Sequence, residues 1–445
     1  MIDAIATDRD AFIVKLAAVQ SPASTASAPS YFVAAALSDH SILLYGVQLP
    51  SASSPLPATR LLCTLRSHSA TITDLAFFNQ HSSFPSPSPP AGSHVLLSSS
   101  EDGTVCLFDC RSTSSAPLTT LRTPHSAPVF SVAGSGQHVL AGSESAVYLF
   151  NAQTGRLLQS LSDFHCDEVT AVAFHPVDAN QLFSASLDGT VCHFTLSDPD
   201  PDEWLQASFQ VESDVRRIGF FGPHADYLYA LTTTEQLSLW HIERALCVSS
   251  YPADIRAALS AVVGCHVDYL LDCHYELSTQ RLFLLAGNNN GSLCATHLNR
   301  ASVTPVWTHH SSNTTDYNEV RPEDVNVSIW TEDGEEKALD GSSSVTAQEQ
   351  KDNGGQQQHH TRAQHAAMEQ EQVADEKKAA GEDRVVDPSA AGHTAAVRDV
   401  LWLDSVLLAG GNDGKLSVWT SDVRSKPAPQ STGRQRRKSN ATMDD

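Results

Sequence analysis

The sequence predicts an all-β fold built from repeats, and three observations support this prediction. One pattern recurs seven times: a β-prone strand, a tight turn, and a second strand that ends close to an aromatic residue. Neighbouring copies follow one another at 42–46 residues where no insertion intervenes. Several turns contain Asp-Gly or Asn-Gly, which tolerate positive φ and are typical of β-hairpins.

The copies align on their turns. The clearest two read LLSSSEDGTVCLFDC at 96–110 and QLFSASLDGTVCHFTL at 181–196. The turn position is Asp in four of the seven copies, and the position six residues later is aromatic in six. The turn positions are 39, 102, 144, 188, 234, 290 and 413, and the later positions are 45, 108, 150, 194, 240, 296 and 419.

Two further strands flank the hairpin in several copies. A histidine leads the preceding strand at His68, His165 and His393, and a shorter strand follows the aromatic, as at 60–65 and 155–161. Four short strands at this period are typical of a β-propeller blade, whose flat faces become buried only by stacking on neighbours. The sequence therefore predicts a seven-bladed β-propeller.

These residues resemble the WD-repeat family of seven-bladed propellers. The resemblance implies that His, Ser, Asp and Trp side chains form a hydrogen-bonded tetrad within a blade. Phe108 and Phe194 lack the indole donor of Trp, and Gly411 takes the Ser position of the last copy, so we expect partial networks. The residues assigned to structural roles within the blades are His68, Ser100, Asp102, His165, Ser186, Asp188, Phe194, Trp240, His393, Asp413 and Trp419. A narrower resemblance, to one group within the family, rests on residues 215–242, 266–299 and 392–419.

The sequence is consistent with two ways of closing the ring, which differ in the role of residues 11–19. The segment AFIVKLAAV at 11–19 could pair with the last blade and supply its outer strand, because prolines interrupt the residues after Trp419. The alternative is that 11–19 is the innermost strand of blade one.

The chain divides into four parts. Blades one to six take residues 10–310 and the last blade takes 391–422, with an acidic, Gln-rich insertion at 311–390. The insertion has too few apolar residues to offset its ordering entropy, so we expect it to be disordered, either as a solvated loop or as a site that recruits a basic partner. Residues 423–445 should form a disordered tail with a basic cluster, Arg434, Arg436, Arg437 and Lys438, compatible with nuclear import.

Composition narrows the function. The formal charge of −23 argues against binding of nucleic acid or anionic membranes, except locally through the basic tail. No apolar run approaches about 18 residues, and the first residues are acidic where a secretory signal would be basic. We therefore expect an intracellular protein, in the nucleus or the cytoplasm, that does not enter a membrane.

One segment resembles a metal site. CHVDYLLDCH at 265–274 contains Cys265, His266, Asp268, Asp272, Cys273 and His274. On a strand, two Cys-His pairs eight residues apart would lie about 25 Å from one another. Zinc ligands lie within about 2.3 Å of the metal, so we expect no metal there. No phosphate-binding loop or nucleophile motif occurs, so we expect neither an enzyme nor a bound cofactor.

The residues Phe108-Asp109-Cys110-Arg111 allow a more specific hypothesis. They resemble the aromatic-Asp-x-Arg box through which WD-repeat substrate receptors dock on the adaptor of cullin-4 ubiquitin ligases, with Phe in place of Trp. The plainer interpretation is that an aromatic-Asp pair is routine in these repeats and that Arg is common in exposed turns. We expect a non-enzymatic protein-interaction scaffold, with the ligase receptor as the alternative. An enzyme would require polar groups that converge in the central channel.

Overall fold

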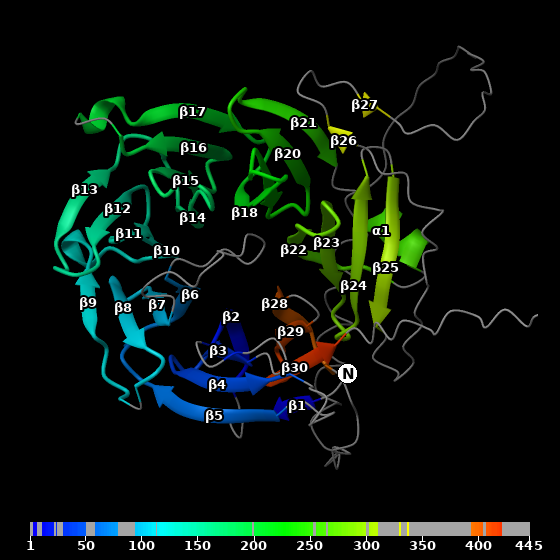
Figure 1. The fold of residues 1–445 in the computed structure, drawn as a ribbon, viewed down its shortest axis with the longest axis horizontal. Coiled ribbons are helices and arrows are strands. Elements are labelled where there is room, and N and C mark those ends of the chain that lie inside the picture. The colour runs from blue at the N-terminus through cyan, green and yellow to red at the C-terminus, as the bar shows by residue number, and fades with distance from the viewer. Residues whose placement is uncertain are drawn as a thin grey trace, which may run out of the picture.

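Seven four-stranded antiparallel sheets form a ring around a central axis (Figure 1). The structure is a computed structural model. It describes residues 3–6, 11–21, 24, 30–49, 58–78, 94–112, 114–197, 200–251, 255–263, 266–299, 302–309, 329–330, 336–337, 393–403 and 406–420. The predicted seven-bladed propeller is confirmed.

Blades one to three follow one another along the chain, and each runs from the innermost strand outward. Blade one contains β2 (Ile13–Gln20), β3 (Ser30–Leu37), β4 (Ile42–Gln48) and β5 (Ala58–Leu65). Blade two contains β6 (Ile72–Phe77), β7 (Val95–Ser100), β8 (Thr104–Asp109) and β9 (Thr119–Arg122). Blade three contains β10 (Ser131–Ser135), β11 (His138–Gly142), β12 (Val147–Asn151) and β13 (Leu157–Leu161).

Blades four to six repeat the same order. Blade four contains β14 (Ala171–Phe174), β15 (Gln181–Ala185), β16 (Thr190–Thr195) and β17 (Leu205–Gln210). Blade five contains β18 (Val215–Phe221), β19 (Tyr227–Thr232), β20 (Leu237–His241) and β21 (Leu246–Tyr251). Blade six contains β22 (Tyr269–Glu276), β23 (Arg281–Gly287), β24 (Leu293–Asn299) and β25 (Ser302–His309).

The last blade joins the two ends of the described chain. It contains β28 (Val397–Leu403), β29 (Val406–Gly411) and β30 (Lys415–Thr420), and its outer strand is β1 (Asp3–Ala6). Strand β1 pairs antiparallel with β30, from Asp3 opposite Val418 to Ala6 opposite Lys415. The proposal that 11–19 supplies this outer strand is therefore wrong, because those residues form β2, the innermost strand of blade one. The amino-terminal segment closes the ring, but with an earlier and shorter strand.

Few other elements accompany the ring. Helix α1 (Ile255–Val263) lies in the connection from blade five to blade six and buries Ile255 and Leu259 against them. Two short 3-10 helices (Pro124–Ser126 and Pro201–Glu203) lie between strands, and β26 (Ile329–Trp330) pairs with β27 (Glu336–Lys337). No helix in the described part of the chain is long and apolar enough to span a membrane.

The hydrophobic core lies between blades rather than at the ring axis. The described residues form seven buried clusters, and each joins the facing sheets of two neighbouring blades, including the last and the first. This follows from strands that are apolar on both faces and have a sheet on either side. Cys106, Cys192 and Cys294 are buried in three of these clusters.

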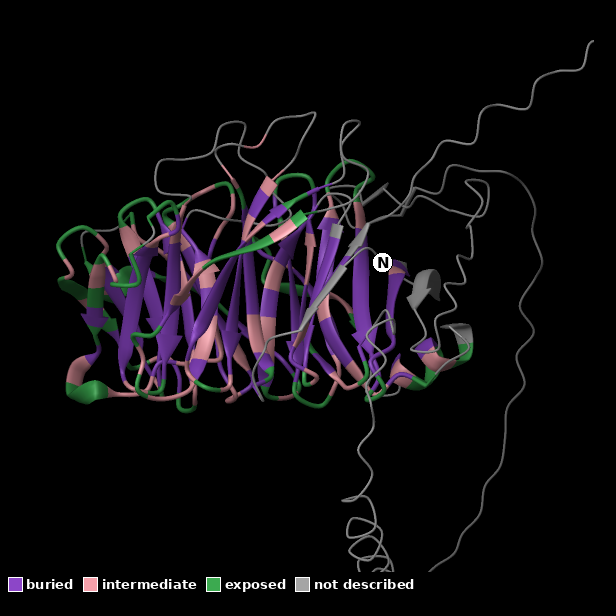
Figure 2. Ribbon diagram, turned by 90° about the horizontal axis from the view of Figure 1, so that it is seen from below, coloured by how far each residue is buried: buried purple, intermediate pink, exposed green. Residues whose placement is uncertain are grey.

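Exposed residues lie on the two flat rims of the disc, where the strands turn (Figure 2), and along the outer strands of the blades, for example at Leu61, Leu158 and Leu246. The turn rim carries the turns between second and third strands, for example 101–103, 186–189 and 412–414, together with the connections between blades. The far rim carries the remaining turns, for example 110–118 and 152–156. Both rims present loops from several blades on one rigid body.

Candidate interaction surfaces

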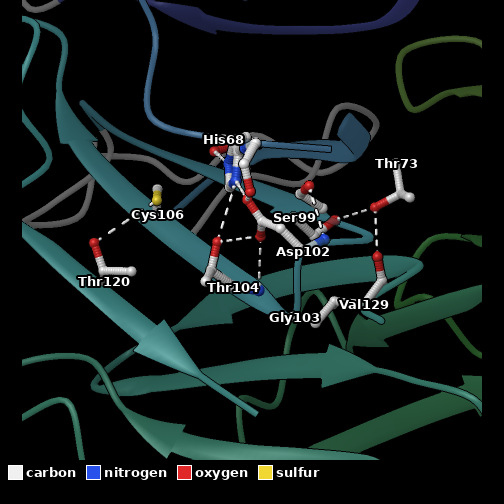
Figure 3. Close-up of polar contacts among 12 residues, drawn as sticks. His68, Thr73, Ser99, Asp102, Gly103, Thr104, Cys106, Thr120 and Val129 are labelled. Atoms are coloured by element: carbon white, nitrogen blue, oxygen red, sulfur yellow. Dashed lines mark hydrogen bonds and ion pairs between the residues drawn. The ribbon is translucent and has the colours of Figure 1, made fainter. Parts of the chain in front are cut away.

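In blade two, one histidine joins three strands. His68 precedes β6, and its Nδ1 lies 3.2 Å from Asp102 Oδ2 in the turn, while its Nε2 lies 2.7 Å from Ser98 Oγ on β7 (Figure 3). The side chain of Thr104, the first residue of β8, donates to Asp102 Oδ1 and lies 3.2 Å from His68 Nδ1. The backbone N–H of Ser69 donates to Asp102 Oδ2 at 2.9 Å. These hydrogen bonds hold the turn at 101–103 against His68 and Ser69, which precede β6.

The protonation of this network follows from its partners. Burial lowers the pKa of His68 more than the carboxylate of Asp102 raises it, so the imidazole is neutral near pH 7. Burial alone would raise the pKa of Asp102, but hydrogen bonds from Thr104 and the Ser69 N–H, together with His68, bring it below its ordinary value. A carboxylate can only accept, so His68 Nδ1–H donates to Asp102 and Ser98 donates to Nε2.

Blades four and seven repeat this arrangement. His165 contacts Asp188 Oδ2 at 3.1 Å and Ser184 Oγ at 2.7 Å. His393 contacts Asp413 Oδ1 at 2.9 Å and Ser417 Oγ at 2.7 Å.

The serine in each network differs from the one that the sequence indicated. Ser98 and Ser184, two residues upstream of Ser100 and Ser186, contact the histidines in blades two and four. Ser100 and Ser186 instead accept from the backbone N–H of the turn aspartate two residues later, at 3.2 and 3.1 Å. In the last blade the position equivalent to Ser98 is Ala409, and Ser417 on the third strand contacts His393 instead.

The aromatic positions pack between blades. Phe108 and Phe194 are fully buried, and Phe194 meets Phe164 edge-on with 5.0 Å between ring centroids. Trp240 uses its indole N–H within its own strand, donating to Ser238 Oγ at 2.8 Å. The side chain of Trp419 lies outside the described residues.

A polar cavity of about 330 Å³ opens beside the blade-two network. The cavity is lined by the segment that precedes β6, by the turn at 101–103 and the start of β8, and by β9 with the residues before it. The lining residues are Ser67, Ser69, Asp102, Thr104, Pro117, Thr120 and Arg122. The carboxylate of Asp102 is already occupied by the donors described above. Arg122 is exposed, and its guanidinium has no ion pair with any described residue. The cavity therefore offers hydroxyl groups and an available cation.

The Phe108-Asp109-Cys110-Arg111 segment lies on the far rim, where β8 ends. Arg111 donates to both oxygens of Asp109, from Nε at 3.0 Å and from Nη2 at 2.9 Å. Its side chain is 55% exposed, whereas Phe108 and Cys110 are buried. Hydrogen bonds from Arg111 hold the pKa of Asp109 below its ordinary value. The segment thus presents an exposed ion pair between Arg111 and Asp109, and its other two side chains, Phe108 and Cys110, are buried.

The side chains of 265–274 serve separate purposes. Asp272 binds Arg217, Cys273 is buried between blades five and six, and the ring of His274 stacks on Trp402 with 5.4 Å between centroids. His266 contacts Asp268 before the strand begins, and Cys265 lies outside the described residues. Within the described ranges, no three His, Cys, Asp or Glu side chains are grouped to hold a metal ion.

Charged residues on the innermost strands were missed by the sequence analysis. Lys15 on β2 pairs with Asp74 on β6 at 3.0 Å, and Arg217 on β18 pairs with Asp272 on β22 and Asp399 on β28. The available signal was a charged residue two positions after the start of an otherwise largely apolar strand, as at Arg217 in VRRIGFF and Asp399 in VRDVLWL. Its partners are too far apart in sequence for the pairing to be predicted.

Two predicted segments cannot be compared with the structure. The insertion at 311–390 lies outside the described residues apart from β26 and β27, and so does the tail with Arg434, Arg436, Arg437 and Lys438.

Comparison with known proteins agrees with the blade architecture. The family model for the WD domain, G-beta repeat, matches residues 59–109 and 155–195, which include the hairpins of blades two and four. These two stretches of the chain are similar to the WD repeat. The histidine-aspartate networks of blades two and four lie within the matched stretches.

WD-repeat relatives cover part of the chain. A WD repeat-containing protein 89 homolog of Dictyostelium discoideum is 32% identical over 199 residues, 45% of this chain and 54% of the relative. WD repeat-containing protein GTS1 of Arabidopsis thaliana is 30% identical over 230 residues, 51% and 56% of the two chains. An uncharacterized WD repeat-containing protein of Saccharomyces cerevisiae is 33% identical over 85 residues, 19% and 22% of the two chains. The first two matches span about half the length of these relatives, and the first confirms the narrower resemblance, which is to WD repeat-containing protein 89.

Proposed function

We propose that this WD-repeat propeller is a non-enzymatic scaffold that binds other proteins through the loops of its rims. The observation that carries the proposal is the pair of rims, each a set of exposed turns held on one rigid ring by the clusters between blades. Rigid loops lose little conformational entropy when they bind, so a ring of them suits protein recognition.

The cavity in blade two is the docking point that the geometry supports best. Arg122 offers a planar cation beside the hydroxyls of Ser67, Ser69 and Thr120. A guanidinium binds carboxylate or phosphate oxygens through two parallel hydrogen bonds. The cavity therefore suits an acidic side chain on an extended segment of a partner.

Partner capture tests this assignment. Tagged wild-type protein and Arg122→Ala are purified from cells and their partners are quantified by mass spectrometry. Arg156→Ala is the matched control, because Arg156 is an exposed arginine on the far rim of blade three. We expect Arg122→Ala to reduce recovery of at least one partner tenfold while Arg156→Ala leaves it unchanged. Equal recovery from all three proteins would exclude docking at this cavity.

The alternative function is a substrate receptor of a cullin-4 ubiquitin ligase. The observation that favours it is the exposed, doubly hydrogen-bonded Arg111–Asp109 pair at the end of β8. The purified ligase adaptor should then bind the wild type and Arg156→Ala but not Arg111→Ala. Absence of adaptor binding to the wild-type protein would leave Phe108, Asp109 and Arg111 as a structural feature of one blade.

A further inference from the structure

The innermost strands of five blades share an irregularity followed by a charged residue. The pairing register shifts by one residue immediately before Lys15, Asp74, Arg217, Asp272 and Asp399. An extra residue in a strand redirects the next side chain relative to its sheet. In each of these blades the redirected side chain bonds to a neighbouring blade.

Arg217 is the centre of the most extensive of these contacts. Its Nη1 donates to Asp272 Oδ2 on blade six at 2.6 Å, and its Nη2 donates to Asp399 Oδ1 on the last blade at 2.9 Å. The other oxygen of Asp399 accepts from the backbone N–H of Leu16 on blade one at 2.9 Å. One guanidinium and two carboxylates thus connect four blades.

These groups have partners for their buried polar atoms. Tyr229 donates to Asp272 Oδ1 at 2.8 Å, and the side chain of Asp399 is only 2% exposed. Burial would lower the pKa of Arg217, but the two carboxylates raise it well above its ordinary value. Removal of one member would leave a buried charge uncompensated, which is far more costly than loss of an exposed pair.

The contacts of Arg217 lie beside the last blade, which the polypeptide connects to blade six only through a long segment. Strand β25 ends at His309 and β28 begins at Val397, so 87 residues separate blade six from the last blade. The outer strand of the last blade comes from the opposite end of the sequence. The position of that blade therefore depends on contacts between blades, and the polar contacts include the Arg217 group and the hydrogen bond from the Val397 N–H to Tyr269 Oη.

We propose that Arg217, Asp272 and Asp399 form a latch that docks the last blade between blades six and one. The latch holds β28 to β18, β22 and β2 whether or not the chain between β25 and β28 is intact. Cutting that connection leaves the ring assembled, whereas removing Arg217 releases the last blade and leaves blades two to four folded.

Specific cleavage of the full chain tests the latch. A protease site is inserted after residue 355, the protein is cut, and the fraction of carboxyl-terminal fragment that co-elutes is measured by size-exclusion chromatography at 0.15 M salt. We expect the cut wild type to retain the fragment and Arg217→Met to retain it at least tenfold less. Arg111→Met is the control, because it also breaks a two-bond Arg–Asp pair but on the exposed far rim.

Hydrogen exchange on the uncut chain gives a second test if Arg217→Met does not fold. Arg217→Lys keeps the charge but cannot bond two carboxylates as a planar fork. We expect amide exchange at least tenfold faster in 397–403 and 415–418, with unchanged exchange in blades two to four. Loss of the fragment from the cut wild type, its retention by Arg217→Met, or a uniform or absent change in exchange in Arg217→Lys would overturn the proposal.

Discussion

At the scale of single residues, His68 shows how one side chain orders a blade. Its two ring nitrogens contact Asp102 in the turn and Ser98 on the second strand, and it precedes the first strand itself. A neutral imidazole suits this role because it has one donor and one acceptor nitrogen. The same arrangement around His165 and a similar one around His393 show that this is not a feature of one blade alone.

The two serines of blade two should differ in importance. Ser98→Ala leaves a buried imidazole nitrogen without a donor, so we expect the free energy of unfolding to fall by about 1–3 kcal/mol. Ser100→Ala removes only an acceptor for the N–H of Asp102 in a half-exposed turn, and should cost less. Urea unfolding of both variants compares them. A larger loss for Ser100→Ala would contradict the assignment of Ser98 to the network.

His40 and Glu235 both adopt the left-handed conformation at turns where other blades have glycine. Their φ values are 64° and 62°, and the equivalent positions in four other blades are Gly103, Gly189, Gly291 and Gly414. A side chain in this conformation costs about 1–2 kcal/mol. Glu235 has a compensating contact, because its carboxylate accepts from the N–H of Leu270 at 2.6 Å. The Nδ1 of His40 is buried without a hydrogen-bond partner among the described residues.

This difference predicts opposite effects of the same substitution. His40→Gly relieves the backbone and removes an unsatisfied group, so it should raise the free energy of unfolding by about 1 kcal/mol. Glu235→Gly also relieves the backbone but loses a charged hydrogen bond worth about 1.5–3 kcal/mol, so it should lower stability. Thermal unfolding of the two variants in one buffer checks the signs. Stabilisation by Glu235→Gly would show that its bond to blade six contributes little.

At the scale of strands and turns, the sequence was sufficient for local features and insufficient for distant ones. Seven hairpins followed from period-2 patterns and turn residues, which act within about ten residues. The choice between Ser98 and Ser100 was not available, because both lie on the same face of β7 and only the path of the His68 segment distinguishes them. Strand β1 is only four residues long, too short to give a recognisable strand pattern in the sequence. Arg217 and Asp399 are separated by 182 residues.

A glycine on β18 shows how one strand makes room for the next. Gly219 lies opposite Tyr229, and a Cβ at Gly219 would lie within 2.6 Å of the tyrosine ring and hydroxyl. Tyr229 must lie across this glycine to reach Asp272 and Cys273 O. The space at Gly219 therefore positions a donor of the Arg217 group.

Gly219→Ala should displace the tyrosine and destabilise the protein by about 1–3 kcal/mol, as overpacking of a core does. Gly46→Ala is the matched control, because a Cβ there would make only an ordinary contact with Leu62 at 3.5 Å. The control should be neutral or stabilising by about 0.5–1 kcal/mol, since alanine has the smaller entropy cost in a strand. Denaturant midpoints measure both. Similar stability of the two variants would contradict the close approach.

At the scale of the whole molecule, stability should fall as the pH falls. Burial lowers the pKa of His68, His165 and His175 in the folded protein, and that of His193 to about 4. Below about pH 6.5 the unfolded chain binds protons that the folded ring excludes. Each such proton lowers the free energy of unfolding by about 1.4 kcal/mol per pH unit, and for His193 this continues to about pH 4.

Chemical unfolding at several pH values between 7 and 4.5 measures this slope. His193→Gln removes one of the titrating groups and should make the slope shallower by up to about 1.4 kcal/mol per pH unit. A free energy of unfolding that stays constant over this range would show that the folded ring accommodates charged histidines.

The ring has its core between blades and its exposed turns on two rims, which leaves its circumference to the outer strands. Residue-specific photo-crosslinking in cells tests most directly whether the rims are the binding surfaces. A photoreactive residue is placed at Glu101 on the turn rim, at Gln153 on the far rim, or at Leu158 on the outer strand β13, all of which are exposed. We predict protein crosslinks from Glu101, Gln153 or both, and none above background from Leu158. Crosslinks from Leu158 alone, or from none of the three, would contradict a scaffold that binds through its rims.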